Sequence, residues 1–199
     1  MAIDAVSIGN MALAHVGAKG RIESLDEQTP GAKQVKLWYD VARTLTLENH
    51  DWGFARVRLA LALHSEAPPE EWDFRYQFPA NVVSIRGIWN PLGPSADAIP
   101  YELELASDQS TVTILTNQES AVAFFTANIS STTLFPLSFV SAFSRKLAEM
   151  IAYSLTGKTE VQDQQTERFE LEASKAATFD AMQGMKSPPR DSEWTRGRR

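Results

Sequence analysis

The chain has 199 residues, of which 43% are apolar and 22% are charged, and its formal net charge is −6. This length and composition suit one domain, or one domain with a smaller insertion, that folds around an ordinary hydrophobic core. The absence of cysteine excludes disulfides, thiolate nucleophiles and cysteine-based zinc sites. The acidic balance argues against a protein that coats DNA, because such proteins need a basic face.

Residues 1–11 lack the pattern of a signal peptide, and no stretch has the roughly 20 apolar residues of a membrane span, so we expect no membrane contact.

The first third of the chain has the apolar period of two helices. Residues 2–17 form the first, which we expect to end at Gly17. The second begins with Thr29 as N-cap and Pro30 in the first turn, and we expect it to end near residue 50. One side of this helix is predicted to face the core, and it comprises Val35, Trp38, Val41, Ala42 and Leu45. Tyr39, Asp40 and Arg43 lie off that stripe.

The middle of the chain changes to a period of two, which is typical of strands. We expect strands over residues 54–63, 72–78, 82–89, 101–105, 112–116 and 122–126, with a Pro/Gly-rich loop at 90–100. In the first, Val57, Leu59, Leu61 and Leu63 alternate with other residues, which predicts a half-buried strand. Short loops without intervening helices predict an antiparallel sheet.

The helical period returns after residue 133. Pro136 suits a helix start and Gly157 a helix stop. Between them an apolar residue recurs every four positions, as Phe139, Phe143, Leu147, Ile151 and Leu155. Residues 158–183 predict a charged helix whose narrow apolar stripe packs on one neighbour or on a partner subunit. That stripe consists of Val161, Phe169, Ala173, Ala176, Phe179 and Met182.

The fold predicted from this order is α+β, a bundle of about four helices with an inserted antiparallel β-sheet domain and an extended C-terminal tail. The divisions are residues 1–53 for the first helices, 54–133 for the β domain, 134–185 for the last helices and 186–199 for the tail. The tail combines two adjacent prolines with arginines and one tryptophan, so it cannot build a core. We expect a neighbouring chain to hold it, with Trp194 as an aromatic anchor among cationic side chains. The predicted partner-binding residues are Arg190, Trp194, Arg196, Arg198 and Arg199.

A search for chemistry finds no convincing site. His50, beside Asp51 and near Glu48, is better explained as a solvated helix end than as a metal ligand. His15 lies near a helix terminus, where a protonated imidazole is favoured, and we interpret it as capping or packing. Residues 157–159, Gly-Lys-Thr, lack the earlier glycine and the preceding strand of a phosphate-binding loop, so they predict a turn between helices. We therefore expect no catalytic, cofactor-binding or metal site.

Two further features admit a functional interpretation. Glu102 and Glu104 share one face of a strand and could form an acid pair, although a solvated strand face or an acidic channel surface is the better explanation. The alternating aromatic residues of 72–78 could stack on bases, but the neighbouring Glu70 and Glu71 would repel phosphates, so they predict a sheet core.

Residues 12–61 resemble the tail tubular protein A family, the adaptor subunits of short-tailed bacterial viruses. The resemblance is carried by residues 14–17 (AHVG), 22–27 (IESLDE), Ala32, Tyr39, Asp40, Arg43, residues 48–55 (ENHDWGFA), Arg58 and Leu61, and further along by residues 78–80 (FPA) and Val83. Asp51 departs from the family, which often has proline after the histidine. The resemblance implies a ring of twelve copies, with the portal protein above it and the tail nozzle or other tail proteins below.

The expected function is thus a structural, non-enzymatic virion protein at the head-tail junction, made in the host cytoplasm, through which genomic DNA passes without specific binding. The alternative is a nucleic-acid-binding regulator that uses the basic C-terminal arm. A third interpretation is a hydrolase of cell-wall polymers with its site on the sheet loops, for which Glu102 and Glu104 are the residues to test.

Overall fold

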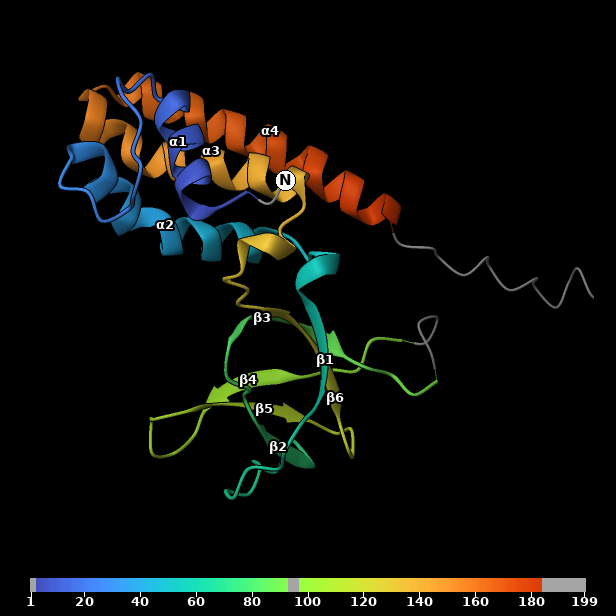
Figure 1. Cartoon of the computed structure of the whole chain (residues 1–199). Coiled ribbons are helices and arrows are strands. Elements are labelled where there is room, and N and C mark those ends of the chain that lie inside the picture. The colour runs from blue at the N-terminus through green and yellow to red at the C-terminus, as the bar shows by residue number, and fades with distance from the viewer. Residues whose placement is uncertain (1–2, 93–96, 184–199) are drawn as a thin grey trace, which may run out of the picture.

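The computed structural model describes residues 3–92 and 97–183. The helices of these segments gather in one part of the molecule and the strands in another, with two chain segments crossing between them (Figure 1). The helices are α1 (Ala5–His15), α2 (Pro30–Asn49), α3 (Leu137–Thr156) and α4 (Thr159–Gln183), with short 3-10 turns η1 (Gly53–Ala55) and η2 (Thr132–Leu134). The strands are β1 (Arg56–Ala60), β2 (Phe74–Gln77), β3 (Val82–Ile88), β4 (Glu102–Leu105), β5 (Val112–Thr116) and β6 (Val122–Ala127). The chain is therefore an α+β protein, as predicted.

Local signals fix the helix ends. The side chain of Asp4 accepts a hydrogen bond from the Ser7 amide at the start of α1. At the start of α2, Thr29 Oγ1 accepts one from the Ala32 amide at 3.2 Å, which confirms the predicted cap. Gly157 ends α3 in the left-handed conformation at φ 67°, and α4 begins at Thr159, so Gly157 and Lys158 form a turn between two helices where the sequence predicted one. None of the helices in the described segments has both the length and the apolar character that a membrane crossing needs.

The core of the helical part is built on α3, which contacts the other three helices. Phe139, Phe143, Leu147 and Ile151 are fully buried, which confirms the predicted period of four. The rings of Phe139 and Phe143 pack edge-to-face with aromatic residues from the N-terminal half; the ring centroids of Trp52 and Phe139, for example, are 5.2 Å apart. Segments far apart in sequence therefore share one core.

The predicted core face of α2 is wrong in part. Tyr39 and Arg43 are buried, whereas Val41 and Leu45 are exposed. The helix is rotated relative to the prediction because Tyr39 packs against Phe143 at 5.0 Å and because the Arg43 guanidinium finds buried acceptors. An apolar strip is left facing outward.

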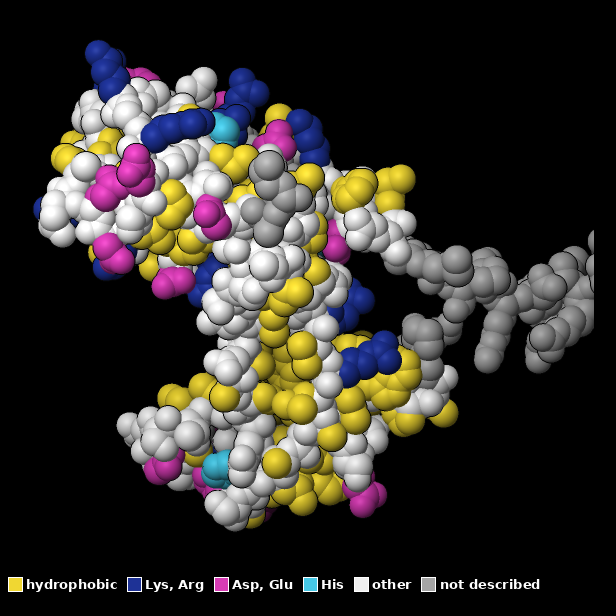
Figure 2. Space-filling model, viewed as in Figure 1, with side chains coloured by type: hydrophobic (Ala, Val, Ile, Leu, Met, Phe, Trp, Pro, Cys, Tyr) yellow, Lys and Arg dark blue, Asp and Glu magenta, His cyan; other side chains and the backbone are white. Residues whose placement is uncertain are grey.

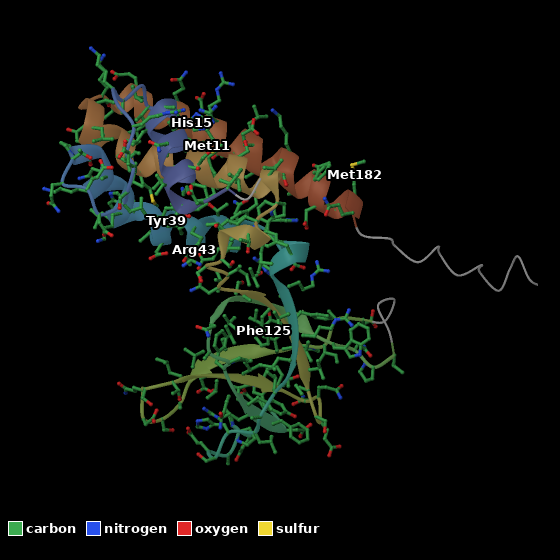
Figure 3. The ribbon with its side chains drawn as sticks, in the orientation of Figure 1. Met11, His15, Tyr39, Arg43, Phe125 and Met182 are labelled. Carbon is green, nitrogen blue, oxygen red and sulfur yellow. The ribbon has the colours of Figure 1, made fainter. Side chains whose placement is uncertain are left out.

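The six strands form two antiparallel sheets of three strands, in the orders β1-β6-β3 and β2-β5-β4, where the sequence predicted an antiparallel sheet without a division. A small core of Tyr76, Ile114, Ala123 and Phe125 joins strands of both sheets, and Phe125 lies in the middle of this part in Figure 3. The aromatic strand is thus a core strand, as expected. By contrast, all five residues of β1 are exposed, so the predicted half-buried strand is wrong, because β1 lies at a sheet edge.

Candidate assembly surfaces

The segment that leads from α2 into β1 is a buried aromatic corner. Trp52 is fully buried, and its indole N–H donates to the Thr46 carbonyl at 2.8 Å. The next amide, that of Gly53, donates to a carboxylate oxygen of Asp180 at 2.9 Å. Asp180 Oδ2 also lies 3.4 Å from His50 Nε2. The last turns of α4 therefore hold the point where the chain leaves the helical part.

Arg86 connects β3 to the end of α2. Its Nε donates to Thr126 Oγ1 at 2.8 Å within the sheet. Its Nη2 reaches the carbonyl oxygens of Leu47, Glu48 and His50 at 3.2, 3.0 and 2.9 Å. Those carbonyls belong to the helix end, where they lack partners within the helix and where the helix dipole favours a cation.

Arg43 holds the segment that returns from β6 to α3. This buried side chain donates from Nη1 to Asn128 Oδ1 at 2.7 Å and to the Ile129 carbonyl at 2.6 Å. It also pairs with Asp40 at 3.2 Å. In Figure 3, Arg43 lies on α2 close to the β part. Arg43, Arg86 and Asp180 thus hold the narrow region between the two parts, which we call the neck. The sequence alone did not single out Arg86 or Asp180, because their partners lie far away along the chain.

The outer face of α2 carries Leu37, Val41 and Leu45, one above the other at intervals of four residues. All three are exposed, and we call them the α2 strip. An aligned apolar strip on a helix surface is available for contact with another protein.

The predicted apolar stripe of α4 is divided. Phe169, Ala173 and Ala176 are buried within the chain, so this stretch packs on one neighbour, as expected. Phe179 and Met182 remain exposed, Met182 to 79%. They lie at the end of α4 that extends beyond the bundle, where Figures 2 and 3 show an apolar patch and the labelled Met182. Within residues 3–92 and 97–183 this end is held through Asp180, while the side chains of Phe179 and Met182 stay largely uncovered.

The carboxylates considered for catalysis have a structural explanation. Glu104 pairs with the buried Arg75 at 3.2 Å, and Arg75 also lies 3.6 Å from Glu66. Glu102 and Glu104 lie on the exposed edge strand β4. Within the described segments, no three His, Asp or Glu side chains come close enough together to hold a metal ion.

His15 packs between helices. Its Nε2 lies 3.2 Å from Ser144 Oγ, and Gln165 Nε2 donates to the His15 carbonyl at 3.0 Å. Burial, together with the positive charge of Arg145, lowers the pKa of His15 to about 4, against the opposing effect of Glu172. The packing interpretation is thus confirmed. Burial outweighs the helix-end effect, which would favour the protonated ring and raise the pKa.

The predicted partner-binding residues Arg190, Trp194, Arg196, Arg198 and Arg199 lie outside the described residues, so their role stays a prediction. A scan against models of protein families and a search of curated proteins gave no match to this chain. The resemblance to the tail tubular protein A family is therefore carried by the quoted residues alone.

Proposed function

We propose that this chain is a non-catalytic structural subunit of a bacterial virus, in which copies form a ring that joins the portal to the tail. The observation that carries the proposal is the placement of exposed apolar side chains. They occupy the α2 strip, the end of α4 and the edge strands of the β part. A subunit that worked alone would leave these surfaces in water at a cost in solubility.

The neck supports the same proposal. A ring subunit has to hold its two parts at a fixed angle, because each part meets a different neighbour around and along the ring axis. Arg43, Arg86 and Asp180 join the two parts by direct hydrogen bonds. Several of the residues that carry the resemblance, including Arg43 and Trp52, lie in this region.

The charge of the chain fits the passage of DNA. Each copy carries a formal net charge of −6, and a closed ring multiplies that charge around its axis. A negative passage repels phosphates, so the genome slides through without specific binding. In this proposal the ring has twelve copies, contacts the portal protein and the tail nozzle or other tail proteins, and belongs to the virion after assembly in the host cytoplasm.

Native mass spectrometry of the purified chain, alone and mixed with its portal protein, tests the proposal. We expect a closed oligomer of defined copy number, either alone or once the portal is added. A chain that stays monomeric under both conditions at tens of micromolar would contradict the proposal. Where a ring forms, electron microscopy of the virus particle shows whether that ring lies between head and tail.

A further inference from the structure

Two strands lie at free edges of the two sheets. β1 forms one edge of the sheet β1-β6-β3, and β4 forms one edge of the sheet β2-β5-β4. Every residue of both strands is exposed, and neither edge is paired with another strand in the described segments. Unpaired edges offer rows of backbone donors and acceptors to another strand.

The two edges carry complementary side chains. In β1, Arg56 and Arg58 alternate with Val57 and Leu59, whereas in β4 two glutamates alternate with two leucines. Because side chains alternate across a strand, each edge has one charged face and one apolar face. The apolar side chains are incompletely covered in the isolated chain, with Val57 exposed to 42% and Leu103 to 45%. One edge is basic and the other is acidic.

We infer that β1 of one copy pairs with β4 of the next copy, so that a continuous sheet crosses the contact between neighbouring subunits. The inference rests on the proposed function in that it requires copies of this chain to meet. The backbone groups of Arg56 and Arg58 face the free edge of β1, since Leu61 bonds to Ala121 and every second residue faces β6. Those of Leu103 and Leu105 face the free edge of β4, since Ala106 bonds to Thr111 and Glu102 and Glu104 face β5. A parallel register that sets Arg58 beside Glu102 and Leu59 beside Leu103 therefore lets the two edges exchange backbone hydrogen bonds. Residues that lie side by side on neighbouring strands share a face, so the charged pair lies on one side of the new sheet and the apolar pair on the other.

The contacts within the chain favour Arg58 and Glu102 as the central pair. Arg56 is already paired with Asp51 at 2.6 Å, and Glu104 with Arg75 at 3.2 Å. The Arg58 guanidinium instead stacks on the rings of Trp89 and Phe124, at 4.5 and 4.9 Å from their centroids. Glu102 forms no salt bridge with any residue of the described segments.

The same charges select the partner. Two copies of β1 repel each other through their arginines, and two copies of β4 repel through their glutamates, so only the mixed pair is attractive. A mixed contact joins different surfaces of the two copies. Such contacts build either a closed ring or an open filament, and a ring is what the proposed function needs.

Charged residues on edge strands also have a simpler explanation, because they protect an edge against aggregation. Protection is served equally well by either sign on either edge. That explanation does not account for the distribution of the charges, in which β1 carries only arginines and β4 only glutamates. This distribution is what pairing between copies requires.

Disulfide cross-linking tests the contact directly, since the natural chain has no cysteine. A mixture of the Leu59→Cys chain with the Leu103→Cys chain is oxidised mildly and run on a non-reducing gel. We expect a covalent dimer containing one copy of each. The Leu59→Cys chain mixed with a Leu63→Cys chain is the matched control, because Leu63 is also exposed on the β part but has no place in the pairing. Equal cross-linking in both mixtures would overturn the inference.

A charge exchange gives a second, independent measurement. Arg58→Glu and Glu102→Arg are each expected to weaken self-association at least tenfold, as measured by sedimentation equilibrium. The variant with both exchanges is expected to recover most of the lost affinity. Unchanged circular dichroism and melting temperature in each variant establish that the fold is intact. Failure of the double exchange to recover affinity would count against the pairing.

The outcomes separate this inference from the proposed function. A ring that forms without the cross-link and without recovery on charge exchange overturns the strand pairing but leaves the adaptor proposal in place. Cross-linking into open filaments supports the pairing and contradicts the adaptor. A wild-type chain that neither associates nor cross-links at any concentration, with or without portal, overturns both.

Discussion

Arg86 lies on a strand, yet most of its hydrogen bonds reach the end of a helix. Its Nη2 donates to three carbonyl oxygens of residues 47–50, which are the groups a helix leaves without internal partners. The contact therefore stabilises the helix end and fixes the β part against it at the same time.

Arg86→Ala is expected to lower the free energy of unfolding by about 2–3 kcal/mol, because several charge-assisted hydrogen bonds are lost at once. Urea unfolding followed by tryptophan fluorescence measures the loss. Arg168→Ala, which removes an exposed arginine of α4, is the matched control and should change stability by less than about 0.5 kcal/mol. Equal stability of Arg86→Ala and the wild type would mean that the neck does not depend on this side chain.

His15 makes the stability of the helical part depend on pH. Burial lowers its pKa to about 4 in the folded chain, whereas the free imidazole titrates near pH 6.5. The unfolded chain therefore takes up the proton first as pH falls. Stability from this group is fully present above pH 6.5 and is lost as pH falls from there through about 4.

Replacing His15 with glutamine should remove that dependence. Between pH 7 and pH 4.5 the wild type is expected to lose about 1–3 kcal/mol more stability than His15→Gln in urea unfolding. Carboxylates with lowered pKa values titrate in both chains and cancel in the comparison. A proton NMR titration of the His15 ring gives a direct check, and a midpoint near 6.5 in the folded chain would contradict the buried, neutral state.

At the scale of elements, the sequence predicts helix ends better than helix faces. Thr29, Pro30 and Gly157 act locally, so the limits of α2 and α3 follow from their neighbours in sequence. The buried face of α2 does not, because Arg43 is held inward by Asn128 and Ile129, which lie 85 and 86 residues further along the chain. For the same reason the sequence predicts neither the neck nor the division into two sheets, since both depend on contacts between segments that are distant along the chain.

The α2 strip gives a test at this scale. Val41→Glu places a charge in the middle of the strip, where the wild-type side chain is exposed, so the monomer should unfold within about 0.5 kcal/mol of the wild type. If the strip meets a neighbour or the portal, assembly should weaken at least tenfold by light scattering. Val35→Glu is the contrasting variant, because Val35 is fully buried and its replacement should prevent folding. Normal assembly of the folded Val41→Glu chain would show that the strip stays exposed.

At the scale of the whole molecule, α4 carries the chain from the bundle toward residues 184–199. Its last described turns contact the neck through Asp180 and expose Phe179 and Met182. The following segment contains Trp194 and several arginines, while the chain as a whole has a net charge of −6. In the proposed ring, acidic surfaces on neighbouring copies would be available to those arginines, and the exposed apolar side chains would be available to an aromatic anchor.

Trp194→Ala is expected to weaken ring or portal assembly about tenfold to a hundredfold, the range that follows from losing 1–3 kcal/mol at an aromatic anchor. Ser192→Ala in the same segment should have no effect.

Deleting residues 186–199 separates the adaptor from the nucleic-acid alternative. Loss of assembly, with no DNA retained by the intact chain at low salt, favours the adaptor. Salt-sensitive DNA retention that disappears on deletion, with assembly unchanged, favours the regulator, because phosphate contacts weaken steeply as salt rises.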